Sequence, residues 1–202
     1  MKSITQATYD RIAPAFAEVN AKMPENMLPA VQKFLEYIPK NGLCLDLGCG
    51  PGRDSAWFAQ HQLKMIGADF SMGMLIQAKK TTTCPLVQMD MLQLGFVNQS
   101  FSGIWCNAAL LHLPKVEAPQ ALKEMRRILC KDGILDLAIQ KGEGEQLETN
   151  PYASEQGQRF FARYDLPEIT KLLETSGFAI LETVERTSNQ RNWIRLIARC
   201  AS

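Results

Sequence analysis

The sequence predicts an α/β fold in which helices cover both faces of a mostly parallel sheet. From residue 43 onward, short apolar runs alternate with helical segments, which is typical of parallel strands joined by helices. Near the end, two apolar runs separated by residues 188–190 predict a hairpin that adds one antiparallel strand. A length of 202 residues and a hydrophobic content of 46% fit one globular domain spanning residues 1–202.

Capping residues and apolar spacing predict the individual elements. Ser71 is expected to cap a helix that runs through residue 79, and Asp165, with Glu168 three residues later, caps a helix that ends at Gly177. Apolar residues at helical spacing predict a helix over 121–129 that ends at the Asp-Gly pair 132–133. The other expected elements are a helix at 54–60 and strands at 43–47, 64–68, 85–89, 103–106, 134–139, 178–184 and 193–199.

Two segments stand outside this alternation. Residues 1–40 are expected to form helical pieces broken by prolines such as Pro14, with Asn26 capping a helix that runs to about residue 38. Residues 141–163 are polar and contain glycine. We expect residues 1–40 to form an N-terminal helical lid, and an insertion at about 141–163 to form a cap over the ligand site.

Charge and cysteine content narrow the class of protein. The 22 basic and 21 acidic residues give a net charge of +1, without the basic excess that nucleic-acid binders usually carry. The six cysteines form no Cys-x-x-Cys pair and several lie in apolar runs, which favours buried thiols over metal ligands or disulfides. With no signal peptide and no membrane-spanning run in the sequence, we expect a cytoplasmic protein without a metal and without a membrane partner.

A glycine-rich turn is the strongest motif. Residues 45–54 read Leu-Asp-Leu-Gly-Cys-Gly-Pro-Gly-Arg-Asp and predict a strand, a tight turn and then a helix. The glycines Gly48, Gly50 and Gly52 permit positive φ and let the backbone contact a ligand directly. The turn therefore predicts a ligand site at the end of the first strand.

Acidic side chains follow three successive strands. Asp46, at the end of the first strand, suits a cationic amino group and would repel a pyrophosphate. Asp69, after the second, can accept hydrogen bonds from both hydroxyls of a ribose. Asp90, after the third, can accept from an adenine amino group while Met91 covers the ring. Asp54 we interpret as a helix cap or part of a solvated turn.

This set of residues resembles the class I S-adenosylmethionine-dependent methyltransferases. The resemblance runs from Tyr9 to the final hairpin and includes residues 101–112, Phe-Ser-Gly-Ile-Trp-Cys-Asn-Ala-Ala-Leu-Leu-His. It implies a Rossmann-like three-layer sandwich around a seven-stranded, mostly parallel sheet whose last strand is antiparallel. It also implies S-adenosylmethionine as cofactor and S-adenosylhomocysteine as product.

The resemblance further implies roles for individual residues. Gly48, Cys49, Gly50 and Gly52 would surround the methionine part of the cofactor, Asp69 and Phe70 its ribose, Asp90 and Met91 its adenine, and Asn107 and Ala108 its sulfonium. Tyr9 looks like the lid tyrosine of related small-molecule enzymes.

Residues that act on the acceptor are less clearly marked. His112 is either a general base or a packed wall residue, and we favour the wall because an activated methyl donor needs little base catalysis. Tyr152, Arg159 and Tyr164 lie in or just after the polar insertion and are candidates for contact with the substrate.

The function expected from the sequence is methyl transfer to an O, N or S atom of a small molecule by a monomer or homodimer. The Asn/Asp-Pro-Pro-aromatic motif of adenine- and amide-directed relatives is absent after the fourth strand, where Asn107-Ala108-Ala109-Leu110 stands instead. We therefore expect no nucleic-acid partner and no glutamine substrate. Two alternatives stay open. One is a non-catalytic, cofactor-binding regulatory module; the other is a nicotinamide-dependent oxidoreductase, which would need a glycine in place of Arg53.

Overall fold

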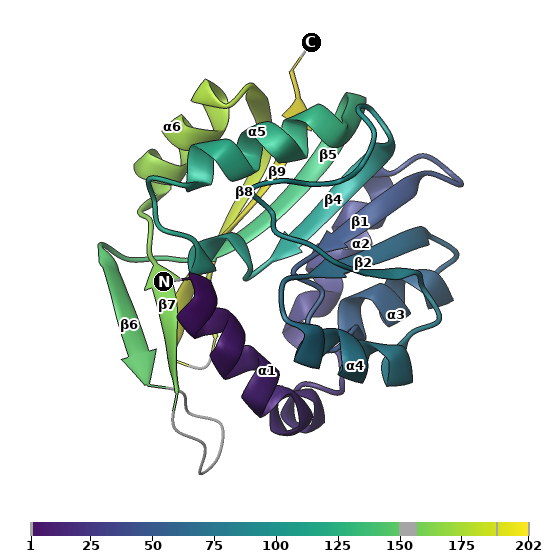
Figure 1. Ribbon diagram of the computed structural model, residues 1–202. Helices are drawn as coiled ribbons and strands as arrows, with labels where there is room; N and C mark the ends of the chain where they lie inside the picture. The colour runs from purple at the N-terminus through teal and green to yellow at the C-terminus, as the bar shows by residue number, and fades with distance from the viewer. Residues whose placement is uncertain (1, 150–156, 189, 202) are drawn as a thin grey trace.

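A seven-stranded sheet forms the centre of the molecule (Figure 1). The computed structural model describes residues 2–149, 157–188 and 190–201. The sheet has the order β3-β2-β1-β4-β5-β9-β8, in which β9 runs antiparallel to both β5 and β8 and the strands from β3 to β5 pair in parallel. The strands are β1 (Leu43–Leu47), β2 (Lys64–Asp69), β3 (Leu86–Gln88), β4 (Phe101–Asn107), β5 (Leu129–Gln140), β8 (Phe178–Ser188) and β9 (Arg191–Cys200). The predicted fold class is confirmed.

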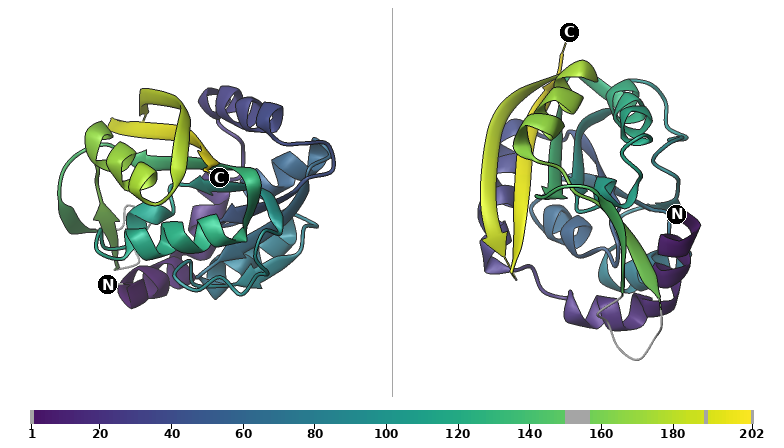
Figure 2. Two further views of the ribbon diagram at one scale, coloured as in Figure 1. Left: turned by 90° about the horizontal axis from the view of Figure 1, so that it is seen from above. Right: turned by 90° about the vertical axis from the view of Figure 1, so that its left-hand side faces the viewer.

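Helices cover both faces of this sheet (Figure 2). Helices α2 (Leu28–Tyr37) and α3 (Arg53–Gln60) pack on one face, where Phe34, Phe58 and Trp105 meet edge to face with ring centroids 5.1–5.5 Å apart. Helices α5 (Ala118–Ile128) and α6 (Leu166–Thr175) pack on the other face, and α4 (Met72–Thr81) lies beside α3. No helix among the described residues is long and apolar enough to cross a membrane.

The strand order reverses beside β1, which pairs with β2 on one side and with β4 on the other. In open parallel sheets, a crevice forms at the carboxyl ends of the strands where the order reverses. The glycine turn after β1 and the end of β4 therefore face the same crevice. Two short helices lie outside the sheet: η1 (Glu25–Met27) follows α1, and η2 (Leu110–His112) follows β4.

Helix α1 (Lys2–Val19) covers this crevice together with a small second sheet. The segment after β5 forms an antiparallel pair, β6 (Glu145–Thr149) and β7 (Gln158–Ala162). Helix α1 contacts α4 on one side and β7 on the other, so it spans the carboxyl ends of the central strands (Figure 1).

The expected break at Pro14 is wrong, because α1 continues through this proline. Contacts with α4 hold the helix in place. Asp10 accepts hydrogen bonds from the Ser71 hydroxyl (2.6 Å) and from the Gly73 backbone N–H (2.8 Å), and the Asp10 backbone lies where a side chain at Gly73 would stand. Tertiary packing thus outweighs the hydrogen bond that a proline removes from a helix.

Two other boundaries differ from expectation. Asn26 does not cap α2: it lies within η1, Met27 occupies the N-cap position, and the Asn26 amide donates to the Ser188 hydroxyl instead. Helix α5 ends at Ile128, because Leu129 is already extended and pairs with Phe101 at the start of β5. The caps predicted at Ser71 and Asp165 are confirmed by bonds from the backbone N–H groups of Met74 and Glu168.

Candidate functional site

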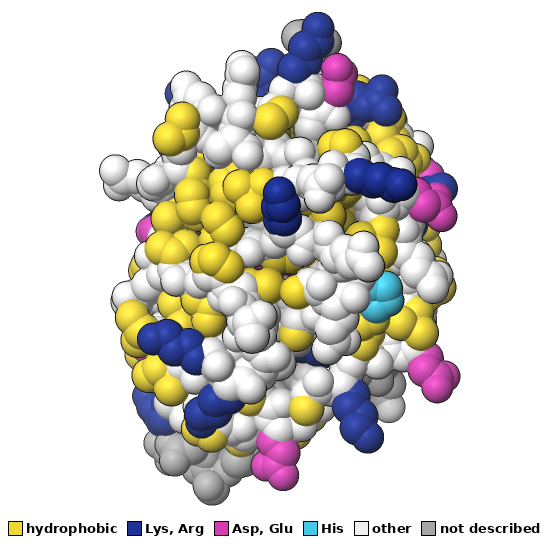
Figure 3. Space-filling view, turned by 90° about the vertical axis from the view of Figure 1, so that its right-hand side faces the viewer, with side chains coloured by type: hydrophobic (Ala, Val, Ile, Leu, Met, Phe, Trp, Pro, Cys, Tyr) yellow, Lys and Arg dark blue, Asp and Glu magenta, His cyan; other side chains and the backbone are white. Residues whose placement is uncertain are grey.

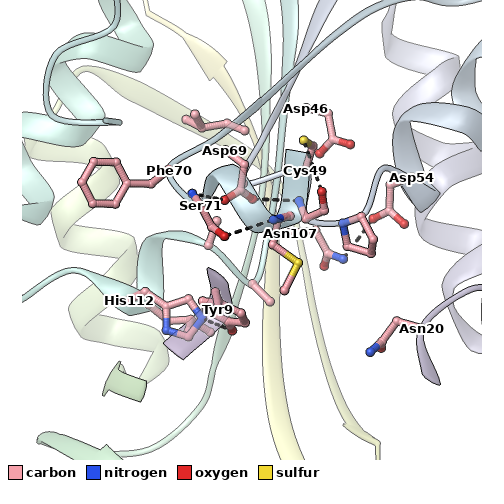
Figure 4. Close-up of a pocket in the computed structure, with 18 of the residues that line it drawn as sticks. Tyr9, Asn20, Asp46, Cys49, Asp54, Asp69, Phe70, Ser71, Asn107 and His112 are labelled. Atoms are coloured by element: carbon pink, nitrogen blue, oxygen red, sulfur yellow. Dashed lines mark hydrogen bonds between the residues drawn. The ribbon is translucent and has the colours of Figure 1, made fainter. Parts of the chain in front are cut away.

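A cavity of about 820 Å³ lies at the carboxyl ends of β1, β2 and β4. Its volume is near the upper end of the roughly 300–1,000 Å³ that small-molecule sites occupy. The glycine turn, α1, β7 and the β8–β9 hairpin all contribute to its wall. Figure 4 shows side chains from α1, the glycine turn and the ends of β2 and β4 around this space.

The glycine turn brings the backbone to the edge of this cavity. Gly48 has φ +77°, and a side chain there would come within 2.3 Å of the Ala109 Cβ atom. Gly50 has φ +53° with open space at its Cβ position. Gly52 caps α3 with φ +82°, packs near Ala78 and is not among the residues that line the cavity. Glycine is thus required at 48 to avoid a collision, and at 50 it leaves backbone available to a ligand.

Asp46 is buried at the floor of the cavity. Its carboxylate accepts a hydrogen bond of 2.6 Å from the Ser55 hydroxyl. Burial, together with the neighbouring charge of Asp54, raises the pKa of Asp46 to about 8. A buried carboxylate with an elevated pKa and no direct ion pair among the described residues is suited to receive a cationic group from a ligand.

Asp69 holds the turn from the end of β2. One carboxylate oxygen accepts from the Gly50 backbone N–H and the other from the Ser71 backbone N–H, each at 2.8 Å (Figure 4). Burial raises the pKa of Asp69 to about 6, while these backbone bonds act in the opposite direction. Each oxygen keeps a second lone pair for a ligand donor.

Asp90 lies at the end of the cavity where β3 leads into a turn. Its carboxylate accepts from Lys2 Nζ at 2.8 Å and from the Leu92 backbone N–H at 3.0 Å. Met91 and Phe70 line the same region. The Lys2 contact ties the first turn of α1 to this end of the site.

Tyr9, His112 and Arg159 form a hydrogen-bonded cluster where α1 meets η2 and β7. Nδ1 of His112 lies 2.7 Å from the Phe160 carbonyl oxygen, which can only accept, so Nδ1 carries the proton. Nε2 then accepts from the Tyr9 hydroxyl at 2.8 Å, and Arg159 donates to the same hydroxyl at 3.2 Å. Burial lowers the pKa of His112 to about 4. The imidazole is therefore neutral and fixed in one tautomer.

We expect His112 to stay neutral throughout the neutral pH range. Nitrogen-15 NMR of the imidazoles, recorded from about pH 5 to about pH 9, should show no titration of His112. The chain has two histidines, so a His61→Gln variant assigns the remaining signal. A titration of His112 with a midpoint near the ordinary value of about 6.5 would contradict this assignment.

A buried polar network supports Asn107 at the end of β4. The Asn107 amide donates to Asp54 (3.2 Å), and its oxygen accepts from Arg195 (2.8 Å), which also pairs with Asp136. Asp54 accepts from the Trp105 indole as well, at 2.9 Å. These bonds fix which side of the Asn107 amide faces each neighbour.

Most of the site residues predicted from the sequence come together. The residues of the set that line the cavity are Tyr9, Asp46, Gly48, Cys49, Gly50, Asp69, Phe70, Asp90, Met91, Asn107, Ala108, His112 and Arg159. Tyr164 is 1% exposed, lies beside Lys115 and does not line the cavity. Tyr152 lies outside the described residues.

Sequence reasoning missed several residues of the wall. Asp54 is not a solvated cap, because it is buried and bonded to Trp105. Arg186, Arg191 and Trp193 line the cavity from the β8–β9 hairpin, far in sequence from the glycine turn. One signal in the sequence could have indicated them: residues 191, 193 and 195 alternate along a strand, so their side chains lie on the same face of the sheet.

Comparison with known proteins fits this geometry. The model of the family described as "Methyltransferase domain" matches residues 44–133, which span β1 to the early part of β5. The chain is 29% identical over 168 residues to a putative methyltransferase of Encephalitozoon cuniculi, covering 75% of this chain and 77% of the relative. Residues 44–133 thus form a methyltransferase domain, and the chain has the fold of S-adenosylmethionine-dependent methyltransferases.

Other methyltransferases resemble it over different shares of their length. A probable tRNA methyltransferase 9B of Mus musculus is 28% identical over 166 residues, which cover 82% of this chain but 33% of that protein. The chain thus spans about a third of the length of that relative. The 1,6-didemethyltoxoflavin-N1-methyltransferase of Burkholderia thailandensis shares the fold, with a TM-score of 0.72, 20% identity, and coverage of 88% of this chain and 79% of that one.

The cavity fits the cofactor of this methyltransferase family. S-adenosylmethionine carries a cationic amino group, a ribose with two hydroxyls and an adenine. The buried carboxylate of Asp46, the free lone pairs of Asp69 and the accepting oxygens of Asp90 provide acceptors for these three parts along one wall. The described residues contain no group of three or more His, Cys, Asp or Glu side chains placed to hold a metal ion.

Proposed function

We propose that this methyltransferase acts on a small-molecule acceptor, at an O, N or S atom, in the part of the cavity next to the cofactor. The observation that carries the proposal is the coverage of the cavity by α1 and β7, joined through the hydrogen bonds of Tyr9 to His112 and Arg159. Such coverage suits an acceptor that fits within the remaining volume, and it excludes water from the site.

The proposed roles of the residues follow from their positions. Bound S-adenosylmethionine supplies a methyl group activated by a sulfonium. Asp46 would hold its amino group, the backbone of Gly48, Cys49 and Gly50 its carboxylate end, Asp69 and Phe70 its ribose, and Asp90 and Met91 its adenine. Asn107 and Ala108 would lie near the sulfonium, with Gly52 shaping the turn from behind.

Positioning is the main contribution that we assign to the protein. Holding two reactants in line can lower a barrier by roughly 7–11 kcal/mol. The Asn107 network and the turn at Ala108, which has a φ of +58°, fix the backbone at the end of β4. Residues 1–40 and about 141–163 act in this proposal as the lid and cap.

His112 acts in this proposal as a positioning residue for Tyr9 and not as a general base. Its Nε2 atom is occupied by the Tyr9 hydroxyl, and its low pKa makes it a weak proton acceptor. His112→Asn should therefore keep the turnover within about tenfold and lower thermal stability, whereas loss of a true base costs about 10²–10⁴. A pH-dependent rise in rate near neutrality that disappears in this variant would overturn the assignment.

The tRNA methyltransferase 9B relative favours a second candidate, a nucleic-acid acceptor. The net charge of +1 argues against it, and on the side that carries α3 and α4, basic side chains are scattered among acidic and neutral ones (Figure 3). A polymer would also have to insert a single base beneath α1.

The two candidates are separated by following the labelled methyl group of S-adenosylmethionine. In a cell extract split into a low-molecular-mass filtrate and purified RNA, we expect the label in the filtrate. Binding to bulk tRNA should be weak at physiological salt. Label recovered in RNA, together with tight and steeply salt-dependent tRNA binding, would replace the small-molecule proposal. No transfer to either fraction, with intact cofactor binding, would favour the regulatory module.

A further inference from the structure

Charge is unevenly distributed around the cavity. The wall formed by β1, the first turn of α3, β2 and the turn after β3 carries the carboxylates Asp46, Asp54, Asp69 and Asp90. The two cations on that side are already paired, Lys2 with Asp90 at 2.8 Å and Arg53 with Asp54 at 2.6 Å. The wall formed by β7 and the β8–β9 hairpin instead contributes the arginines Arg159, Arg186 and Arg191.

Arg186 is the clearest unneutralised cation of this arginine wall. Its guanidinium donates to the Asn26 carbonyl oxygen at 2.7 Å and contacts the Met27 sulfur at 2.8 Å. No ion pair joins Arg186 to a carboxylate within the described residues. Partial burial lowers its pKa, and the nearby charge of Arg195 lowers it further. A desolvated guanidinium without a carboxylate partner is a strong site for an anion.

The carboxylates near this wall are too few for its arginines. Asp136 pairs directly with Arg195, although its charge also reaches Arg186. Glu148 is shared between Arg163 and Arg191, the latter at a long 3.5 Å. Among the described residues, the two carboxylates Asp136 and Glu148 thus serve four guanidinium groups, those of Arg163, Arg186, Arg191 and Arg195. Glu25 also lines the cavity, but no ion pair connects it with these arginines in that part of the chain.

Apolar surface accompanies the excess positive charge. Trp193 lies opposite Arg186 in the β8–β9 register and lines the cavity. Phe161 lines it from β7, with the Arg191 guanidinium 5.6 Å from its ring centroid. A ligand on this wall would therefore meet both guanidinium donors and aromatic surface.

We propose that the acceptor is an acidic small molecule, whose carboxylate or phosphate group is held by Arg186 and Arg191 and whose apolar body packs against Trp193. This inference rests on the proposed function and specifies its substrate class. The anionic group is distinct from the methyl-accepting atom, which would point toward Asn107 and Tyr9 on the cofactor side.

The test uses three simple probes on the protein saturated with S-adenosylhomocysteine. Benzoate and phenyl phosphate carry the two anions, and benzamide is the neutral isostere of benzoate. Calorimetry or ligand-observed NMR should show at least one anionic probe binding at least tenfold more tightly than benzamide. Arg186→Gln should remove most of that preference and leave benzamide binding unchanged. Arg199→Gln, an exposed position on the same strand as Arg191, is the matched control and should change nothing.

Several outcomes would overturn the proposal. These are equal binding of charged and neutral probes, no detectable binding of either anion, or a preference that survives in both Arg186→Gln and Arg191→Gln. The second variant also covers the case in which Arg186→Gln fails to fold. Strong tRNA binding that is lost in these variants would assign the wall to a nucleic acid instead. Failure of the proposed function is seen separately, as the absence of the labelled methyl group from the low-molecular-mass filtrate in the transfer assay.

Discussion

Replacing Asp69 by alanine is expected to weaken binding of S-adenosylmethionine by about a hundredfold or more. The carboxylate shapes the glycine turn through the Gly50 and Ser71 backbone N–H groups, and in our proposal it also receives the ribose hydroxyls. Hydrogen bonds to a charged group contribute roughly 1.5–3 kcal/mol each, so the loss of two corresponds to about two factors of ten or more. Isothermal titration calorimetry with S-adenosylmethionine measures the effect.

Asp69→Asn is the matched variant that separates charge from shape. The amide keeps one accepting oxygen for the turn, so we expect an intermediate loss of about tenfold. Thermal unfolding of each variant shows whether the fold is intact. An alanine variant that is folded and binds the cofactor with wild-type affinity would remove Asp69 from the site.

Asp46→Asn is expected to change stability and cofactor binding in opposite directions. Because burial raises the folded-state pKa of Asp46 to about 8, its protonated form stabilises the free protein. That contribution is complete below about pH 4 and is lost as the pH rises through about 8. Asparagine cannot ionise, so the variant should melt at a higher temperature than the wild type near pH 8, with the difference vanishing near pH 4.

The same substitution should weaken cofactor binding by at least about tenfold, because a neutral amide cannot pair with the amino group of the ligand. In the wild type, binding near neutral pH should release a proton from Asp46 as the cationic group approaches. Calorimetry in two buffers of different ionisation enthalpy measures that release, which the variant should lack. Equal affinity and equal proton release in the two proteins would contradict the role of Asp46.

The sequence predicted those parts of the molecule that depend on local patterns. The glycine turn, Asp69 and the caps at Ser71 and Asp165 each depend on residues close together in the chain, and the strand–helix alternation sets the parallel sheet. The hairpin predicted near the end of the sequence is also confirmed, and its second strand, β9, is antiparallel to β5 and β8.

Features that depend on distant partners could not be predicted in this way. Asp54 looks like a first-turn helix residue, and its burial depends on Trp105, 51 positions later. Pro14 stays within α1 because Asp10 is bonded to residues 61 and 63 positions away. The excess charge around Arg186 depends on which carboxylates the fold brings to β8 and β9, and the near-neutral total charge does not reveal it.

The most direct test of the central claim is a crystal structure of the protein with S-adenosylhomocysteine bound. We expect the ligand in the cavity at the ends of β1, β2 and β4, with its ribose hydroxyls on the Asp69 carboxylate, its adenine beside Asp90 and its amino group toward Asp46. A ligand bound outside this cavity, or inside it with the ribose turned away from Asp69, would contradict the claim.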